Sequence, residues 1–351
     1  MAYTTIDNSE LYFQTKLYTG NGGTQAITLD GSENMQPDWT WLKCRSNLES
    51  HELYDAVRGA TKMISSNLTN AETTKSTALT SFNSDGFTLG SNFEVNASGR
   101  TFAAWCWKAG TSFTNDASAT GVGTIDSTGS ISTAAGISIM SYTGTGSNAT
   151  VGHGLGVAPS MVIEKKTNGS TGWRVYHHGV GATKSLFLDG TEAAVTSNAY
   201  FNDTSPTISV FTIGTNSGIN ASGDTYIAYC FAEKPGYSKF GSYVGNGNAN
   251  GPFIYTGFKP AFFLVKNVTN AGYDWELRDN KRDSYNPVGY RLEANTSDAE
   301  SSYYAEYDFV SNGIKIRQNG NNYNTSGASY IYMAFAENPF VNSNGVPTNA
   351  R

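Results

Sequence analysis

Charged side chains are scarce in this chain of 351 residues. Asp, Glu, Lys and Arg together make up 15% of it, and the formal net charge is −6. A nucleic-acid-binding surface needs clustered lysine and arginine, because much of its affinity comes from contacts to phosphates. The composition therefore argues against a nucleic-acid partner.

Long apolar segments are also missing. No run approaches the roughly 20 apolar residues that a membrane-spanning helix needs. The first residues, MAYTTIDNSELYFQTKLY, lack the basic region followed by an apolar core that marks a secretion signal. We therefore expect a protein that is made in the cytoplasm without a signal peptide and does not insert into a membrane.

Cysteine and histidine are few, with three and four residues respectively. Three scattered cysteines do not make a disulfide framework or a zinc knuckle. His177 and His178 are adjacent, and adjacent residues of a strand point to opposite faces, so they are a poor ligand pair. We expect no metal and no other cofactor.

Glycine and aromatic residues are abundant instead, with 38 Gly, 21 Tyr and 18 Phe. This balance favours short strands joined by tight turns over long surface helices. Residues 47–64 carry loosely helical apolar spacing, but the segments that align with them elsewhere in the chain read as strand, and we interpret 47–64 as strand plus loop. The sequence predicts an all-β protein.

Three similar segments recur along the chain, each a turn followed by an aromatic strand. They are NASGRTFAAWCW (96–107), NASGDTYIAYCF (220–231) and NTSGASYIYMAF (324–335). Each is preceded by a proline that opens an apolar strand ending in lysine: PDWTWLK (37–43), PSMVIEK (159–165) and PAFFLVK (260–266). Proline suits the first residue of a strand because it has no N–H to donate to the sheet. We call Lys43, Lys165 and Lys266 the anchor lysines.

Alternate residues of a strand share one face, so each copy has a predicted core face. The expected core residues are Trp39, Trp41, Trp105 and Trp107 in the first copy, Met161, Ile163, Tyr229 and Phe231 in the second, and Phe262, Leu264, Met333 and Phe335 in the third. Cys106 and Cys230 hold one equivalent position, where the third copy has Ala334, which favours a small buried side chain. The NAS and NTS triplets match the N-glycosylation pattern, but we favour a turn, for which Asn, Ser and Gly are typical.

These repeats predict three tandem antiparallel β-sandwiches of jelly-roll or lectin-like type, each of about 100 residues. We call them unit 1, unit 2 and unit 3, and expect them at residues 12–110, 139–236 and 237–340. Residues 1–11 are expected to form an N-terminal arm that docks on a neighbouring protein. Residues 111–138, rich in Gly, Ser, Thr and Ala, are interpreted as a linker or a pair of weak edge strands, and 341–351 as a C-terminal tail.

An aromatic residue follows each anchor lysine and has an arginine close by. The pairs are Tyr54 with Arg58, Trp173 with Arg174, and Trp275 with Arg278. An exposed aromatic ring beside a hydrogen-bonding cation can hold a sugar by stacking and polar contacts. The alternative is that each ring packs under a loop and the arginine lies across it. Tyr-rich stretches such as 301–309 are equally consistent with a subunit interface.

Catalytic patterns are weak. A depolymerase needs two carboxyl groups about 5 to 10 Å apart, but Glu233 and Glu337, which recur in FAEKP and FAENP, have Ala109 at the equivalent place in unit 1. We interpret them as turn ligands or surface charges. No Ser/His/Asp or Cys/His pattern stands out, and we predict no catalytic residues.

Two longer stretches carry a family resemblance. HGLGVAPSMVIEKKTNGSTGWRVYHHGVGATKSLFLDG (153–190) and PGYSKFGSYVGNGNANGPFIYTGFKPAFFLVKN (235–267) are similar to the repeated β-sandwich domain of structural and tail-fibre-type virion proteins of tailed bacteriophages, especially marine phages. The likeness covers roughly 12–340. It implies a virion component and brings no catalytic residues with it.

Taken with the resemblance, the sequence predicts a non-enzymatic protein of the bacteriophage virion surface. The main hypothesis is a tail-fibre or spike component that binds host-surface glycans. The alternative is a capsid decoration or appendage protein, and a polysaccharide depolymerase is the least favoured. Expected partners are other virion proteins, through the N-terminal arm, and further copies of the chain, with a trimer as the form common in fibres.

Overall fold

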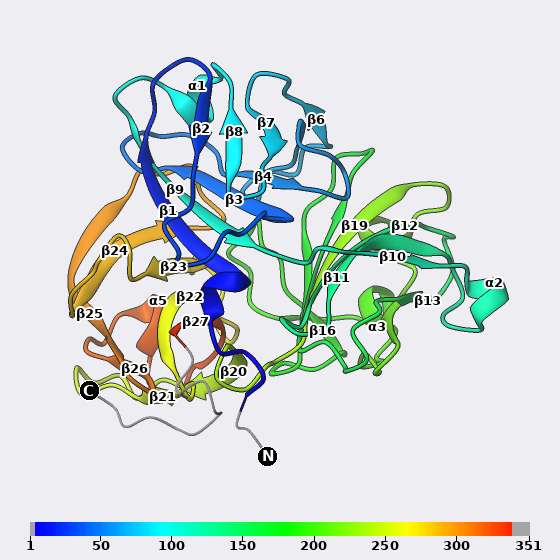
Figure 1. Ribbon diagram of the computed structural model, residues 1–351. Coiled ribbons are helices and arrows are strands. Elements are labelled where there is room, and N and C mark those ends of the chain that lie inside the picture. The colour runs from blue at the N-terminus through cyan, green and yellow to red at the C-terminus, as the bar shows by residue number, and fades with distance from the viewer. Residues whose placement is uncertain (1–3, 339–351) are drawn as a thin grey trace.

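The computed structural model describes residues 4–338, and almost all of its regular structure is short antiparallel strands (Figure 1). The α-helices in this range are single turns of four residues: α1 (Phe93–Asn96), α2 (Ala117–Thr120), α3 (Asn198–Phe201), α4 (Ser217–Asn220) and α5 (Asn321–Asn324). None of them is long enough to cross a membrane. The prediction of an all-β protein is confirmed.

The same order of four antiparallel strands occurs three times. The strand formed by the aromatic repeat segment, here called the closing strand, pairs on one side with the first strand of its unit and on the other with the strand of the anchor lysine. In unit 1 the order is β1 (Phe13–Thr19), β9 (Thr101–Trp107), β3 (Trp39–Cys44) and β4 (Glu52–Asp55). In unit 2 it is β12 (Ile137–Thr143), β19 (Thr225–Phe231), β14 (Met161–Lys166) and β15 (Arg174–His177). In unit 3 it is β20 (Ser238–Val244), β27 (Ser329–Asn338), β22 (Lys259–Asn267) and β23 (Glu276–Asp279).

Each unit has further strands besides these four. Unit 1 adds β2 (Gln25–Ile27), β8 (Phe87–Leu89) and β7 (Leu79–Phe82), and a ribbon of β5 (Lys62–Met63) and β6 (Thr73–Thr74). Unit 2 adds β13 (Ala149–Gly152) with β18 (Val210–Ile213), and a ribbon of β16 (Lys184–Ser185) and β17 (Val195–Thr196). Unit 3 adds β24 (Val288–Glu293), β25 (Ser301–Val310), β26 (Gly313–Ile316) and β21 (Phe253–Tyr255). Because β24 also pairs with β23, the eight strands of unit 3 form one continuous sheet.

Residues 111–138 form strands, which is the second of the two interpretations given for them. β10 (Thr111–Asn115) and β11 (Ser127–Ser132) pair with each other, and β11 pairs with β12. They extend the main sheet of unit 2 to six strands, with β10 at its edge. Few side chains of β10 and β11 reach a core, which explains why these strands have so few apolar residues. Phe113 and Ile131 are the ones that pack against the cluster of unit 2.

The repeated Asn-x-Ser-Gly turn fixes the start of each closing strand. Its glycine takes φ of +77°, +79° and +77° in the three units, a conformation that L side chains rarely adopt. Its asparagine, Asn96, Asn220 or Asn324, ends a short helix and is fully buried. The amide of Asn96 donates to Gly23 O at 2.6 Å and to Gly90 O at 2.8 Å, and the other two make equivalent bonds. The turn interpretation is confirmed, since these buried amides are committed to backbone.

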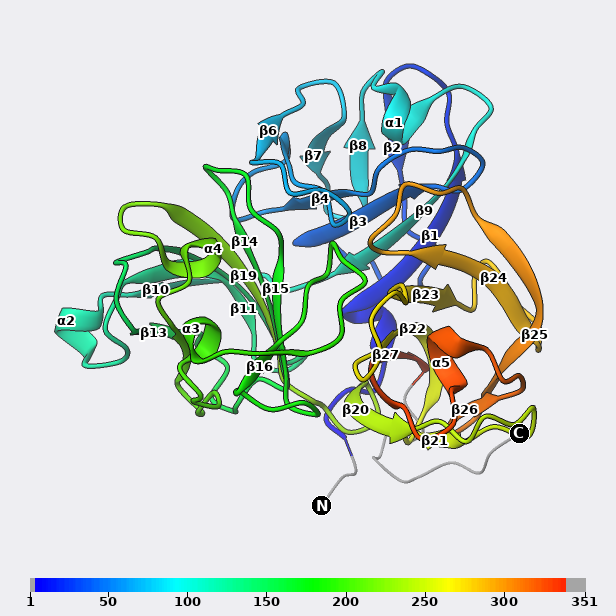
Figure 2. The ribbon, with the colours of Figure 1, turned by 180° about the vertical axis from the view of Figure 1, so that it is seen from behind.

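One face of each main sheet points into a single core that all three units share. Figures 1 and 2 show the three groups of strands meeting at the centre of the molecule. All twelve predicted core residues belong to this cluster. The last aromatic residues of the closing strands meet there, with the ring of Phe335 5.7 Å from that of Trp107 and 6.1 Å from that of Phe231. Trp39 stacks on Trp107 at 4.4 Å and on Tyr229 of unit 2 at 4.5 Å.

The opposite face of each main sheet packs on the smaller strands of its own unit. Three separate clusters result, one in each unit. In unit 1, for example, Phe102 and Ala104 of β9 pack with Phe87 and Leu89 of β8. Cys44, Cys106 and Cys230 lie in these clusters, buried and free, as expected for Cys106 and Cys230 from their positions. Each main sheet is therefore covered on both faces.

Residues 4–11, the described part of the predicted N-terminal arm, contact their own chain at several points. Ile6 is 2% exposed and belongs to the shared core. Ser9, in the short helix η1 (Ser9–Leu11), donates from its hydroxyl to the carbonyl of Glu337 in β27 at 2.6 Å. Asn8 and Glu10 also bond to Ser32 of unit 1, so the segment is held on both unit 1 and unit 3. The predicted C-terminal tail, 341–351, lies outside the described residues.

The shared core predicts that the three units unfold together. We expect a single calorimetric transition, and Phe335→Ala should destabilise the whole chain by about 3–5 kcal/mol, because it opens a cavity among rings of all three units. Phe93→Ala is the matched control, since this ring is 56% exposed and its loss should change stability by less than about 0.5 kcal/mol. Separate transitions for separate units would contradict the prediction.

Candidate functional site

The residues predicted to bind a glycan lie mainly inside the molecule. Tyr54, Trp173 and Arg278 are 0% exposed, Trp275 is 1% exposed, and the side chain of Arg58 is 5% exposed. The exposure predicted for the three rings is wrong, and buried rings cannot stack on a sugar. The alternative of packing under neighbouring structure fits better: the guanidinium of Arg174, which is half-buried, lies 4.6 Å from the ring centre of Phe187.

The two tryptophans bond to the neighbouring unit. Trp173 Nε1 of unit 2 donates to Ser65 O of unit 1 at 2.8 Å, and Trp275 Nε1 of unit 3 donates to Phe187 O of unit 2 at 2.8 Å. In unit 1 the equivalent side chain is His51. Trp41 Nε1 donates to His51 Nδ1, so His51 Nε2 carries the hydrogen and donates to Glu293 O of unit 3 at 2.8 Å. One aromatic N–H therefore crosses each of the three interfaces in the same sense.

A second set of contacts repeats around the molecule. It involves the last residue of the fourth strand of each main sheet: Asp55, His177 or Asp279. Tyr229 OH donates to Asp55 Oδ2 at 2.6 Å, and Trp105 Nε1 donates to Asp279 Oδ2 at 3.1 Å. His177 contributes its own Nε2, which lies 3.2 Å from Tyr332 O, while its Nδ1 accepts from Gly179 N. His178 Nε2 lies 3.0 Å from Phe240 O. The adjacent histidines His177 and His178 therefore both contact backbone carbonyls of unit 3.

The anchor lysines are buried, and two of them bond to a neighbouring unit. Lys43 Nζ donates to Ser297 O of unit 3 at 3.2 Å, and Lys165 Nζ donates to Thr69 O of unit 1 at 3.0 Å. Lys266 Nζ donates to Tyr273 O within its own unit. Burial lowers the pKa of all three lysines to about 8, because the charged ammonium loses its hydration.

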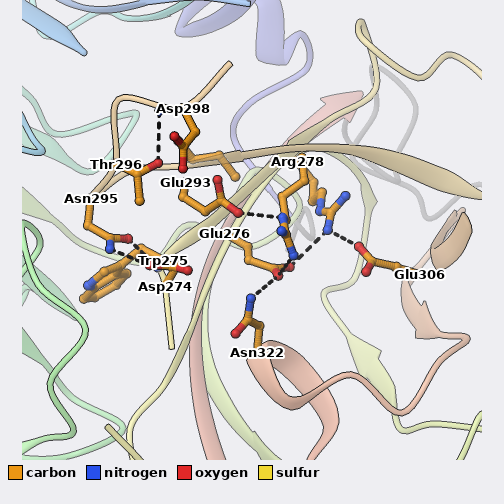
Figure 3. A network of polar contacts seen from close by, with 12 residues as sticks. Asp274, Trp275, Glu276, Arg278, Glu293, Asn295, Thr296, Asp298, Glu306 and Asn322 are labelled. Carbon is orange, nitrogen blue, oxygen red and sulfur yellow. Dashed lines mark hydrogen bonds and ion pairs between the residues drawn. The ribbon is translucent and has the colours of Figure 1, made fainter. Parts of the chain in front are cut away.

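The arginines are held by ion pairs. Arg58 Nε bonds to Asp55 Oδ2 at 2.6 Å, and its other nitrogens donate to Leu53 O, Lys62 O and Glu72. In unit 3, Arg278 binds Glu276, Glu306 and the carbonyl of Gly289 (Figure 3). Both guanidinium groups are committed to fixed neighbours within the protein.

Figure 3 shows the network of polar contacts around Arg278 in unit 3. Glu276 accepts from Arg278 at 3.1 Å, from Asn322 Nδ2 at 2.9 Å and from Tyr307 OH at 3.2 Å. Burial by itself would raise the pKa of Glu276, but the charges of Arg278 and Arg291 lower it overall. Burial raises the pKa of Glu306, and the charge of Arg278 offsets this only in part.

Two carboxyl groups with pKa values shifted apart could in principle divide acid and base roles. Here, however, Glu276 is 0% and Glu306 6% exposed, and neither lines the clefts described below. The cluster is better explained as a buried ion network in which Arg278 offsets the charges of Glu276 and Glu306. Glu233 and Glu337 form surface ion pairs, with Lys239 at 2.6 Å and Lys259 at 2.7 Å, in keeping with the surface charges we expected.

Three clefts on the described surface have a mainly polar lining. One of about 510 Å³ lies between residues 124–128 and 141–145 of unit 2, and one of about 360 Å³ lies between units 2 and 3 beside Lys184 and Val268. A smaller one, of about 90 Å³, lies between Gln14 and Lys281. Within residues 4–338, no cluster of three or more His, Cys, Asp or Glu is placed to hold a metal ion.

Exposed aromatic rings lie at positions that the sequence reasoning missed. Phe253 and Tyr255 of β21 are 48% and 59% exposed, and Tyr285 is 86% exposed. A comparison of equivalent positions in the three units could have found the first two, since units 1 and 2 have no aromatic residue there. Alternation of apolar and polar residues could not have identified Phe253 and Tyr255 as exposed, because Ile254 between them is apolar as well.

The geometry defines a class: an all-β protein of three like units around one core, in which buried side chains bond across the three interfaces. Comparison with known proteins places the chain in a family described as a domain of unknown function (DUF7483), whose model matches residues 8–339. The chain belongs to this family. No match was found among curated proteins or among solved structures.

The interface bonds of the tryptophans predict a specific cost. Trp173→Phe removes the N–H donor and leaves Ser65 O without this partner, which should destabilise the protein by about 1–3 kcal/mol beyond the change in volume. Trp275→Phe should cost about the same because its bond is equivalent. Trp39→Phe is the control, since Trp39 Nε1 has no hydrogen-bond partner. Equal polar costs at Trp39 and Trp173 in urea unfolding would contradict the assignment.

The buried lysines predict a pH dependence. Between pH 8 and the ordinary lysine pKa of 10.5, the unfolded chain holds a proton on Lys165 that the folded chain has released, so rising pH favours the folded state. Relative to Lys165→Met, the wild-type protein should gain stability on the order of 1 kcal/mol per pH unit across this window. Lys184→Met, at an exposed site, should show no such trend. The free energy of unfolding at pH 7.5, 8.5 and 9.5 tests this, and a constant difference would refute it.

Proposed function

We propose that this protein is a non-catalytic component of the surface of a tailed bacteriophage virion, built from three tandem β-sandwich repeats that act as one rigid head. The proposal starts from the similarity of residues 153–190 and 235–267 to phage tail-fibre-type proteins. The observation that carries it is the single aromatic core, which joins the three units into one body. A rigid head of this kind suits a particle that must present a fixed surface outside the cell.

The contacts of the buried histidines and carboxylates support a non-catalytic role. The buried histidines His51 and His177, the paired carboxylates of unit 3 and the interface aspartates all have structural partners among the described residues. Burial lowers the pKa of His51 and of His177, the latter to about 3, so neither is a ready proton carrier near neutral pH. The polar groups stabilise interfaces and leave recognition to the outer loops and sheet faces.

We further propose that the head belongs to a tail fibre or spike and binds glycans of the host surface. The exposed rings of Phe253 and Tyr255 support adhesion, because the equivalent positions of units 1 and 2 carry no aromatic side chain. Attachment to other virion proteins and association with further copies of the chain remain part of the proposal.

Labelling of purified virions tests the proposal. Antibody against the whole chain should decorate the tail tip, and the purified protein should bind host-surface polysaccharide without releasing reducing ends. Label found on the head and never on the tail would favour the capsid decoration alternative, and reducing-end release would favour a depolymerase. Failure to find the protein in any particle would overturn the virion assignment.

A further inference from the structure

Strand β21 breaks the equivalence of the three units. Its central residue, Ile254, faces the core of unit 3 opposite Ile314, as Ile27 does opposite Phe87 in unit 1 and Val151 opposite Phe211 in unit 2. The residues on either side of these core positions differ: Ala26 and Thr28 in unit 1, Thr150 and Gly152 in unit 2, Phe253 and Tyr255 in unit 3. The fold therefore forms twice without aromatic rings here, and their presence in unit 3 calls for a reason other than packing.

The two rings lie on the outer face of the sheet. Phe253 pairs with Lys315 of β26 and Tyr255 pairs with Gly313, while the alternating residues Ile254 and Ile314 are buried. A side chain on Gly313 would come within 2.9 Å of Phe253 Cζ, so the Phe253 ring lies against the bare backbone of that glycine. A ring supported from below and 48% exposed offers an apolar face to a ligand.

Hydrogen-bonding groups border this apolar face. Asp308 of β25 pairs with Lys315, and its carboxylate lies 3.5 Å from Arg317 Nη1, whose side chain is 53% exposed. The Lys315 ammonium donates to Gly251 O. Stacking rings next to a carboxylate and a guanidinium provide both kinds of contact that a sugar offers, C–H groups on the ring face and hydroxyls on its rim.

A third exposed ring lies at the same end of this sheet. Asn286 fastens its loop to β25, donating from Nδ2 to Phe309 O at 2.9 Å and accepting from Phe309 N at 2.8 Å. This loop carries Tyr285, which is 86% exposed, and is four residues longer than its equivalents in units 1 and 2. Val310, which follows Phe309, pairs with Gly313, the residue opposite Tyr255.

We infer that the outer face of β21 and β26, comprising Phe253, Tyr255, Asp308, Gly313 and Arg317, binds a hexose unit of a host-surface polysaccharide. The inference rests on the proposed adhesive function and replaces the glycan site expected from the sequence. A saccharide suits this face because two exposed rings lie beside an exposed ion pair, and a sugar offers both C–H groups and hydroxyls. Phe253 and Tyr255, next to Gly313, would stack on one sugar ring, and the ion pair of Asp308 and Arg317 would bond to its hydroxyls.

The test compares wild-type protein with Phe253→Ala/Tyr255→Thr, which installs the unit 1 residues Ala26 and Thr28. A glycan array followed by calorimetry with the best polysaccharide should show at least about tenfold weaker binding by the variant. Its melting temperature should stay unchanged, because Ile254 is untouched. Phe93→Ala, which removes an exposed ring of unit 1, should bind like wild type.

The other outcomes separate the two proposals. If wild type and the double variant bind a glycan equally well, the adhesive function stands and the β21 face is wrong. If wild type binds no glycan, both the adhesive function and this site are refuted. If the double variant instead changes the sedimentation coefficient of the protein, the face is a contact between copies of the chain, and the saccharide assignment is overturned.

Discussion

Burial of one aromatic face by each of three sheets is the constraint on which the rest of this structure depends. Each main sheet has a second face that is satisfied by its own short strands, but its inner face has no cover within the unit. Only the other two units can cover it. The rings of Trp39, Trp107, Phe231 and Phe335 lie where the three inner faces converge, and none of them could be buried by one unit alone.

The shared apolar core also determines which polar contacts form at the interfaces around it. Strands that enter a shared core carry polar groups out of water, and each such group must find a partner or lose free energy. The interfaces meet this demand with the same few devices: a ring N–H to a carbonyl, a strand-end carboxylate to a neighbouring donor, and a buried lysine to carbonyls. These contacts specify which unit lies beside which. Burial of aromatic rings could not do this alone, because the hydrophobic effect is not directional.

The sequence predicted the strands better than their surroundings. Alternation in PDWTWLK and NASGRTFAAWCW identified the faces that share a core, because the period of a strand is a local property. What covers a face is not local. The arginines beside Trp173 and Trp275 favoured exposed rings for binding a sugar, yet each ring is buried and bonds to the preceding unit. Ile6 gave no periodic signal at all, since a single apolar residue has no period.

The joining of three like units in one chain has a genetic consequence. In a trimer of identical subunits, every substitution appears three times, so a residue that serves recognition must be tolerated at all three equivalent places. Here β2, β13 and β21 are encoded separately, and the ring-bearing residues of β21 could arise without disturbing the other two. A covalently linked ring of units can hold its architecture constant in three places while changing its surface in one.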